Sequence, residues 1–435
     1  MTDIVTFGVP FWLDMPRPKF PVVDRDMECD AVVVGGGIAG LKIARLLAQH
    51  GIQTIVVEAG RVGDGASGRN QGSINHGAAL SYRECAASHT REIARQLWNL
   101  GIENHRILEA QIREYEIDCD YQIDGMTSLV RRDQRDFSKI VQGYRSEYEW
   151  LRDDGFDVSF LTEAEAQKAG GNPLYVAALR YNTDAQFHSG KYAIGLGVGI
   201  ARDENVQVFE RSRVQAIRSQ GNETVVQANG FSIRGQKIFL STNALVPQFV
   251  PALATALRAE RGQVIVTEPL SRRPCRGSFG TWMAWWREII EPDGRFRLLF
   301  GGGRERDEPD SLFAQFESDG RPSQTIETLG FQPSPAHQRR LDEQFAILFP
   351  DLIGVQITHR WGGLQSFTAD SLPQMGLVDV ERRIYSMAGF CGRGNCHSDV
   401  GAEFLVAQAC GVESPVVREY GALLESLMRV GRAES

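Results

Sequence analysis

The segment from Cys29 to Gly60 constrains the fold more tightly than any other part of the chain. A β-branched run, AVVV, ends in glycines; LKIARLLAQH then repeats apolar residues at helical spacing up to Gly51, and TIVVEAG is a second apolar run. This order predicts a strand, a helix and a second strand, which pack as a crossover unit on a parallel sheet. We therefore expect an α/β fold that contains a Rossmann-type domain with a parallel sheet.

Three glycines between the first strand and the helix form the pattern G-x-G-x-x-G, namely Gly35, Gly37 and Gly40. The first permits a tight turn, the second lets the backbone approach a pyrophosphate, and the third allows the helix to pack closely on the strand. Glu58 ends the second strand about twenty residues later, where a carboxylate hydrogen-bonds a ribose diol and repels a 2′-phosphate. A glycine turn alone is a weak signal, but together with Glu58 it predicts a dinucleotide site that disfavours NADP.

Composition narrows the class of protein further. A length of 435 residues predicts two domains or one large domain with insertions. The formal charge of −8 and the lack of a long basic run argue against a nucleic acid partner. Seven scattered cysteines without a C-x-x-C pair suggest neither a disulfide framework nor a zinc site. Prolines interrupt the first 26 residues, and no run approaches the ~20 apolar residues of a membrane span. We expect an extended N-terminal arm over residues 1–26 and a cytoplasmic protein with no membrane partner and no metal.

Two glycine-rich segments bear on whether the dinucleotide is FAD or NAD. GDGASGRNQGS (63–73) follows the crossover unit and suits a flat ring system, whereas an ordinary surface loop would not account for Arg69 and Asn70 within it. GFCGRGNCHS (389–398) joins a predicted strand to a helix. A helix N-terminus stabilises the negative charge of a reduced flavin at N1 and O2. A plain glycine connection is the alternative for this second segment.

Residues 260–303 alternate between apolar and polar residues, as in a half-buried antiparallel sheet with a turn at PDG. Alternate side chains of the strand from Trp282 to Arg287 point to one face, so one of two sets faces the cofactor. The sets are Trp282, Ala284 and Trp286, or Met283, Trp285 and Arg287. An aromatic face suits a cationic or apolar amine and Arg287 suits a carboxylate, while core packing is the alternative for the aromatics, including Trp361.

The ordered set of motifs resembles the D-amino acid oxidase-like family of FAD-dependent amine and amino acid oxidoreductases. The resemblance covers about residues 30–410 and rests on VVVGGGIAG…VVEAG, GASGRNQG, RSRVQAI with IFLSTNAL, RGQVIVTEPL, GRFRLLFGG, RWGGLQSFTADSLPQMG and SMAGFCGRGN. GASGRN, the TEPL strand and the aromatic-Arg strand before LFGG are most similar to the gamma-glutamylputrescine oxidase branch. The resemblance implies FAD as the cofactor.

The resemblance also implies which residues contact the cofactor. Those expected to hold the ADP half are Gly35, Gly37, Ile38, Ala39, Gly40, Glu58, Ala59 and, through its backbone at adenine, Val214. Those expected along the flavin and ribityl chain are Ser67, Arg69, Asn70 and Gln71, and those at the pyrimidine edge are Gly392, Arg393, Gly394 and Asn395. The family fold implies a discontinuous FAD-binding domain (27–85, 190–245 and 355–435) and a substrate domain (86–189 and 246–354) whose antiparallel sheet covers the flavin.

In this family a neutral amine passes a hydride from its α-carbon to flavin N5, and the resulting imine is hydrolysed. The protein then supplies orientation and an electrostatic field rather than an acid–base dyad. The candidates for residues at the reaction centre are Arg69, His76, Trp286, Arg287, Arg393 and Cys396. Histidines are structural by default, and His76 and His397 are the two for which a functional role is the alternative.

The sequence departs from the family pattern in two ways. Cys396 stands where sarcosine oxidase-like members have a lysine beside the flavin, and Arg393 replaces the common histidine between the turn glycines. The cysteine that holds flavin covalently in sarcosine oxidases is also missing before Thr368 and Asp370. We therefore expect noncovalent FAD. Cys391 and Cys396 are either reactive thiols in an electropositive turn or small buried hydrophobes.

Three functions remain open on the sequence. The first is an oxidase that removes a hydride from an amine or amino acid and uses oxygen as acceptor. The second is a dehydrogenase that passes electrons to a quinone or carrier protein. The third is a flavoprotein that binds FAD for structure or redox sensing without turning over an amine.

Overall fold

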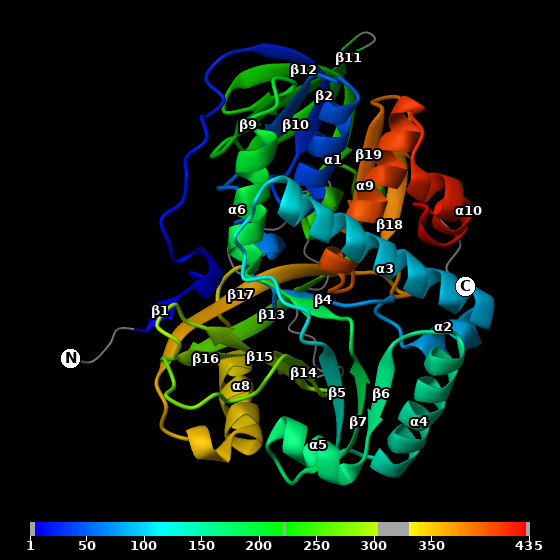
Figure 1. The fold of residues 1–435 in the computed structure, drawn as a ribbon. Coiled ribbons are helices and arrows are strands. Elements are labelled where there is room, and N and C mark those ends of the chain that lie inside the picture. Colours follow the sequence, from blue (N-terminus) through cyan, green and yellow to red (C-terminus); the bar gives the residue numbers. More distant parts are fainter. Residues whose placement is uncertain (1–4, 221–222, 303–329, 432–435) are drawn as a thin grey trace.

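The computed structural model describes residues 5–220, 223–302 and 330–431. Two large mixed sheets dominate it, one with eight strands and one with nine. In Figure 1 the eight-stranded sheet lies in the upper half of the molecule and the nine-stranded sheet in the lower half, with helix α3 crossing between them. The strands of the eight-stranded sheet are β2 (Met27–Val34), β3 (Thr54–Val57), β9 (Val206–Phe209), β10 (Val214–Gln220), β11 (Glu223–Ala228), β12 (Phe231–Leu240), β18 (Gln374–Asp379) and β19 (Ile384–Ala388).

The eight-stranded sheet has a parallel centre, as the crossover unit predicts. β12 pairs in parallel with β2, β2 with β3, β3 with β9, and β19 joins β12 on its other side. All four residues from Ala31 to Val34 are buried because helices or loops cover both faces of these strands. Helix α1 packs on this sheet and ends where Gly51 takes a φ of +70°.

The nine-stranded sheet is largely antiparallel and is built from segments far apart in the sequence. Its strands, with those of a small third sheet (β4 and β8), are β1 (Thr6–Phe7), β4 (Ser73–Ile74), β5 (Met126–Arg131), β6 (Val158–Leu161), β7 (Tyr175–Tyr181), β8 (Ala185–Gln186), β13 (Arg258–Thr267), β14 (Ser278–Gly280), β15 (Ala284–Ile290), β16 (Phe296–Gly302) and β17 (Ile357–Phe367). The β15–β16 hairpin turns at Gly294, within the predicted PDG turn.

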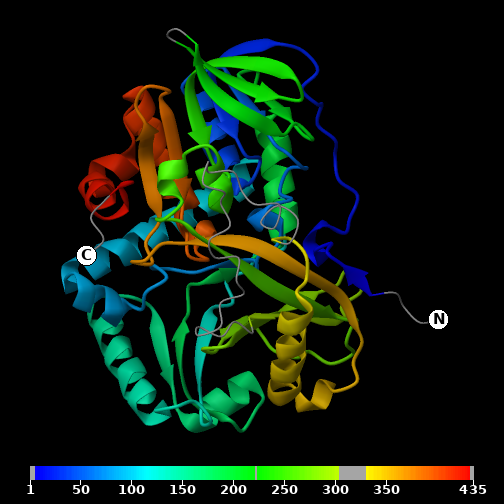
Figure 2. The ribbon, with the colours of Figure 1, turned by 180° about the vertical axis from the view of Figure 1, so that it is seen from behind.

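Helices cover the outer faces of both sheets, and Figure 2 shows from behind that α8 and α5 lie below the nine-stranded sheet. The α-helices are α1 (Ile38–Gln49), α2 (Tyr82–Ser88), α3 (Arg91–Glu114), α4 (Phe137–Asp153), α5 (Glu163–Gly170), α6 (Ser189–Ile200), α8 (Pro335–Leu348), α9 (Gly394–Cys410) and α10 (Pro415–Met428). The 3-10 turns are η1 (Phe11–Leu13), η2 (Ala66–Gly68), η3 (Asn243–Gln248), η4 (Pro251–Leu253) and η5 (Pro350–Leu352).

The N-terminal arm runs along the side of the molecule from the lower sheet to the upper one (Figure 1). Its first strand, β1, pairs in parallel with β17, and Trp12 and Leu13 of η1 are buried. The arm is therefore packed on the body along much of its course.

The predicted α/β fold with a parallel and an antiparallel sheet is confirmed, with one local correction. The strand predicted to begin at Trp282 begins at Ala284, because Thr281 accepts and donates hydrogen bonds that close a turn onto Ala284. Trp282 is 58% exposed in that turn. β17 lies in the segment expected to belong to the FAD domain, yet it pairs with β13 in the nine-stranded sheet.

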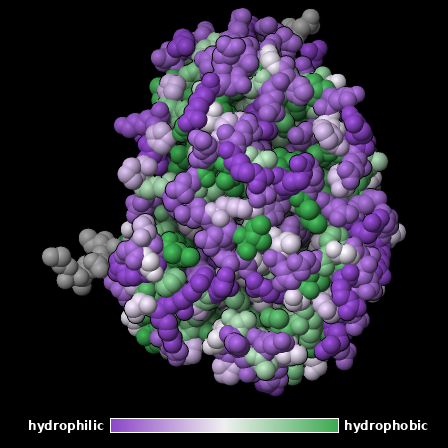
Figure 3. Space-filling view, viewed as in Figure 1, coloured by the Kyte–Doolittle hydropathy of each residue, from purple (hydrophilic) through white to green (hydrophobic). Residues whose placement is uncertain are grey.

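On the described residues, no single helix combines the length and apolar character that crossing a membrane requires. α9 and α10 meet that test only as a pair, and they are bent by 92° relative to each other. Polar residues separate small hydrophobic patches on the face seen in Figure 3.

Candidate cofactor and active site

The turn between β2 and α1 requires glycine at two positions. Gly35 has a φ of +113°, and a Cβ there would lie 2.8 Å from the backbone oxygen of Ser241, which directly follows β12. A Cβ on Gly40 would lie 2.0 Å from the oxygen of Gly35. Any side chain at these positions would push the helix away from the strand ends, so this glycine pattern brings the start of α1 against the sheet.

Glu58 closes this turn from the end of β3. One carboxylate oxygen accepts a hydrogen bond from the Gly36 amide at 2.7 Å, and the other accepts from the Gly60 amide at 2.7 Å. Burial raises the pKa of Glu58, and these two hydrogen bonds oppose that rise. Glu58 and its neighbour Ala59 therefore lie beside the glycine turn, while Val214 is buried at the start of β10.

The GASGRN loop lies against the first turn of α1. Ser67 Oγ accepts a hydrogen bond from the Ile38 amide at 3.0 Å, which anchors the loop beside Ala39 and Gly37. Arg69 donates to the backbone oxygens of Asp64 and Gly362 at 2.7 and 3.0 Å. Burial lowers the pKa of Arg69 to about 10, so it keeps its charge at neutral pH.

Asn70 and Gln71 complete the loop. Asn70 donates to the backbone oxygens of Ala66 and Ser67 and accepts from the Gly72 amide, so its side chain sets the loop's shape. Gln71 donates to the backbone oxygen of Trp286 at 3.4 Å. The loop therefore reaches from the glycine turn to the nine-stranded sheet.

The second glycine turn leads into α9. Cys391 and Gly392 have φ values of +50° and +83°. Among the described residues, no side chain caps the first turn of α9, which starts at Gly394 and holds no acidic residue. Asn395 donates to the backbone oxygen of Ser73 at 3.0 Å. This hydrogen bond connects the turn to the last residue of segment 63–73, which contains GASGRN and is called the GASGRN segment below. The two predicted flavin-binding segments are thus in direct contact.

Asn75 contacts Cys396 of α9, and the next residue in the chain is His76. The Asn75 amide donates to Cys396 Sγ at 3.3 Å, and burial raises the pKa of that thiol. His76 is buried against the carboxylate of Asp184, 2.7 Å from its Nδ1. His397 is fully buried with its Nδ1 toward the backbone oxygen of Arg393, and burial lowers its pKa to about 4.

β15 presents its two faces to different surroundings. Trp286 is fully buried and stacks on Phe279, with ring centroids 5.7 Å apart, on the face covered by α8. Arg287 points to the opposite face, where it donates to the backbone oxygens of Gly72 and Phe187 at 2.8 and 2.9 Å. Of the two sets that the sequence left open, the set with Arg287 is the one next to the GASGRN segment.

Buried polar atoms without partners show that this region fits a dinucleotide with a polar tail. In the described part of the chain, Ser241 Oγ and Thr242 Oγ1 lack a hydrogen-bond partner beside the Gly35 turn. Gln365 Oε1 lacks one beside Gly392. These atoms lie at both ends of the region predicted for FAD, and hydrogen bonds to phosphate, ribityl or flavin groups would satisfy them.

Comparison with known proteins identifies the family. Residues 30–408 match the model of a family described as FAD dependent oxidoreductase. Gamma-glutamylputrescine oxidoreductase of Escherichia coli (strain K12) is 28% identical over 388 residues, which cover 86% of this chain and 82% of that protein. Glycine oxidase of Pseudomonas aeruginosa is 24% identical over 354 residues, or 80% of this chain and 85% of that protein.

The fold has close counterparts among solved structures. Glycine oxidase from Geobacillus kaustophilus superposes with a TM-score of 0.71 at 19% identity, covering 89% of this chain and 96% of that one. L-proline dehydrogenase from P. horikoshii superposes with a TM-score of 0.70 at 19% identity, covering 90% and 96%. The predicted family resemblance and the predicted FAD cofactor are therefore confirmed.

Several residues that shape the site were not found from the sequence. Asn104 of α3 donates to the Asn395 backbone oxygen and accepts from the amide of Asp399, which positions the start of α9. Trp12 of the arm and Asp184 before β8 contact Asn70 and His76. For Trp12, the aromatic residues of the arm were the one sequence feature that pointed to it, and they indicated only that the arm packs on the body. They did not indicate which residue it contacts.

Proposed function

The chain belongs to the family of FAD-dependent oxidoreductases, and from this we propose that it oxidises the C–N bond of an amine or amino acid. The direct contact between the GASGRN segment and the α9 turn carries the proposal, because it brings both predicted flavin-binding segments to one place beside the nine-stranded sheet. The names of the relatives support this substrate class, since they include an oxidoreductase of gamma-glutamylputrescine and an oxidase of glycine.

We assign the two halves of noncovalent FAD to the two ends of this region. The Gly35 turn and Glu58 would hold the ADP half, and Ser67, Asn70 and the turn before α9 would hold the flavin half. When bound, FAD supplies the hydride acceptor. The chain's own contribution is to fix the orientation of the substrate and to place the uncapped start of α9 where negative charge develops.

Arg287 is the proposed anchor for a substrate carboxylate. It is 4% exposed, and burial lowers its pKa to about 10, so a buried positive charge lies beside Gly72. Its guanidinium also donates to three backbone oxygens, those of Gly72, Phe187 and Glu288, so replacing it changes local structure as well as charge. An Arg287→Ala variant should bind a carboxylated amine about 100-fold more weakly, while an amine without a carboxylate keeps its affinity. Equal losses for both amines would leave Arg287 with a structural role alone.

The direct test of the function is reduction of the bound flavin without oxygen. Amino acids, N-methyl amino acids, polyamines and gamma-glutamyl polyamines are mixed with the purified yellow enzyme, and bleaching near 450 nm is recorded. At least one class should bleach the flavin. A protein that stays yellow with every compound would be a flavin-binding protein without amine turnover.

Oxygen is the proposed electron acceptor, and the cytoplasm is the proposed location. All seven cysteines lie in the described residues and none forms a disulfide, which supports a reducing compartment. Under air, one peroxide per oxidised amine supports an oxidase. Bleaching without peroxide, followed by reoxidation by a quinone, would instead establish a dehydrogenase.

A further inference from the structure

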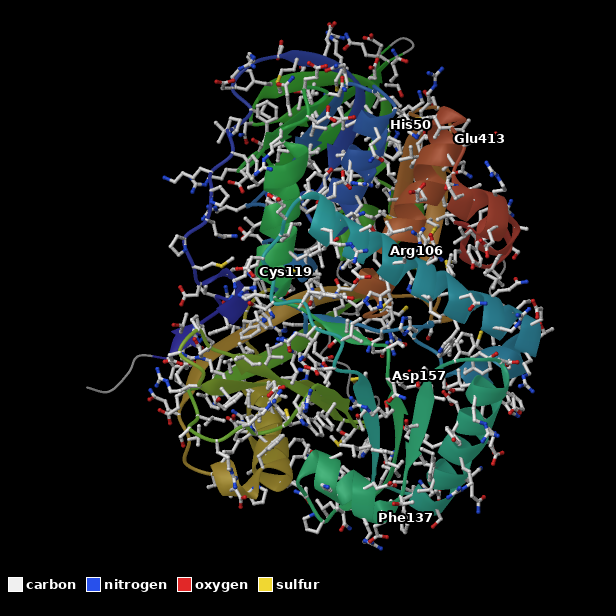
Figure 4. The ribbon with its side chains drawn as sticks, viewed as in Figure 1. His50, Arg106, Cys119, Phe137, Asp157 and Glu413 are labelled. Carbon is white, nitrogen blue, oxygen red and sulfur yellow. The ribbon has the colours of Figure 1, made fainter. Side chains whose placement is uncertain are left out.

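A cleft of about 350 Å³ opens between α3, the turn before β6, and β7. Figure 4 labels Arg106 on α3 and Asp157 before β6 on its two sides. Aromatic and aliphatic side chains line much of its wall, among them Trp98, Ile102 and Phe156. His76, His105 and Tyr121 form the polar part of the wall.

The polar wall is one continuous hydrogen-bonded chain. Tyr121 Oη lies 2.8 Å from His105 Nε2, and His105 Nδ1 lies 3.3 Å from His76 Nε2. His76 Nδ1 lies 2.7 Å from an oxygen of Asp184, which is 2% exposed. Three side chains from separate segments thus connect the cleft to the buried carboxylate of Asp184.

The partners determine the direction of each bond. The Asp184 carboxylate only accepts, so His76 carries its hydrogen on Nδ1 and accepts on Nε2. His105 then donates from Nδ1 and accepts from the Tyr121 hydroxyl on Nε2. Burial and the neighbouring His76 lower the pKa of His105 to about 4, so His105 is neutral at neutral pH.

The inner end of this chain adjoins the site described above. Asn75 donates from its side chain to the second oxygen of Asp184 at 2.8 Å and from its backbone to Cys396 Sγ at 3.3 Å. Cys396 belongs to the first turn of α9, where we place the flavin. The outer end, at Tyr121, faces the cleft.

The charges around the cleft favour a cation. Two charged residues of the lining are in ion pairs, Arg106 with Glu103 and Glu109 with Arg113, and Asp157 adds a further carboxylate. The lining also contains the aromatic residues Trp98 and Phe156, a residue type that attracts cations. Tyr181 on β7 is the remaining ionisable group in the lining.

We propose that this cleft binds an organic ammonium ion and that the chain Tyr121–His105–His76–Asp184 takes up the proton that the amine must lose before oxidation. The proposal rests on the proposed function. The ammonium N–H bond breaks and its proton binds Tyr121, whose own proton passes to His105 Nε2. The Nδ1 proton of His105 passes to His76 Nε2, and that of His76 passes to Asp184. The amine keeps its electron pair, and its charge disappears together with that of the carboxylate.

The test compares flavin reduction across pH in the FAD-loaded enzyme without oxygen. Tyr121→Phe and His105→Gln each interrupt the relay, and Tyr148→Phe on α4 is the matched control. In the two relay variants the reaction should depend on amine that is already neutral in solution. The midpoint of the rate against pH should therefore rise by about one pH unit or more, while the control keeps the wild-type midpoint.

A pH indicator in weak buffer provides a second readout. The wild type should retain the proton when it binds the amine, and both variants should release about one proton per amine bound. Flavin reduction with an unchanged midpoint and unchanged proton release in both variants would remove the relay and leave the proposed function intact. Failure of every amine to reduce the wild-type flavin would overturn both.

Discussion

The indole Nε1 of Trp12 donates a hydrogen bond to the backbone oxygen of Asn70 at 2.7 Å, although 58 positions separate the two residues. Trp12 is 1% exposed, and the guanidinium of Arg287 lies 5.4 Å from the centre of its ring. A Cβ on Gly190 would come within 2.1 Å of the Trp12 backbone oxygen, so α6 packs tightly on the same turn. The N-terminal arm therefore fixes the position of the GASGRN loop.

Replacing Trp12 by phenylalanine should weaken FAD binding. The variant keeps an aromatic ring but loses the hydrogen bond to Asn70, a loss of about 1 kcal/mol that corresponds to roughly a fivefold to tenfold higher dissociation constant. Flavin fluorescence titration of the apoprotein measures this constant. Trp282→Phe, at an exposed tryptophan, is the control and should bind FAD as the wild type does. Unchanged FAD affinity in Trp12→Phe would mean that the arm does not set the loop.

Removing the Glu58 carboxylate should affect the cofactor more strongly. Glu58→Ala leaves the Gly36 and Gly60 amides without their acceptor, and hydrogen bonds to a charged group contribute about 1.5–3 kcal/mol each. We expect FAD affinity to fall by about 100-fold or more. Glu28→Ala, at a carboxylate whose side chain is 79% exposed, is the matched control. Full flavin occupancy of purified Glu58→Ala would contradict the assignment of the ADP half.

The buried ion pair of Lys42 on α1 and Asp399 on α9 should be sensitive to single substitutions. Gln111 donates to the same carboxylate at 2.7 Å, and both charged side chains are at most 1% exposed. Lys42→Met leaves Asp399 buried and unpaired, so the free energy of unfolding should fall by about 3–5 kcal/mol. Lys42→Met combined with Asp399→Leu should recover much of that loss. Urea unfolding of the wild type, of Lys42→Met and Asp399→Leu alone, and of the double variant measures the coupling, and additive losses in the double variant would count against a coupled pair.

Acid should destabilise the fold through buried histidines. Burial lowers the pKa of His105 and His397 to about 4 and that of His188 to about 3, below the ordinary value of 6.5. Between pH 6.5 and these values the unfolded chain binds more protons than the folded one, so stability falls as pH falls. From pH 7 to pH 5 each histidine should lower the free energy of unfolding by about 1–2 kcal/mol.

Urea titrations at several pH values measure that loss. His397→Asn should flatten the dependence of the unfolding free energy on pH. His50→Gln, at the exposed end of α1 labelled in Figure 4, should retain the wild-type slope. A wild-type free energy that is constant from pH 7 to pH 5 would show that these histidines are not neutral in the folded protein.

Local sequence patterns predicted the crossover unit because its constraints act over short distances. Gly35, Gly40 and Glu58 meet through one strand, one helix and the next strand, so their spacing alone brings them together. Gly411 ends α9 with a φ of +66° for the same local reason. The alternation of residues 260–303 predicted an antiparallel sheet for the same reason. The family resemblance added FAD as the cofactor, which no local pattern specifies.

The remaining features depend on contacts between distant segments. Trp12 and Asn70, or Asp184 and His76, show no shared spacing, and only packing of the two sheets brings them together. The start of β15 was misplaced at Trp282 because strand propensity does not reveal the hydrogen bonds of Thr281. The division into two discontinuous domains and the roles of the individual site residues stay predictions.

The interleaved strand order has a consequence during synthesis of the protein. β19 comes from the last part of the chain, just before α9, yet it pairs with β12 in the parallel sheet that contains β2 from near its start. The ribosome must therefore release nearly the whole polypeptide before the predicted flavin half of the site can close. A premature stop between Gly40 and Gly394 should yield a chain that retains the G-x-G-x-x-G turn but carries no flavin.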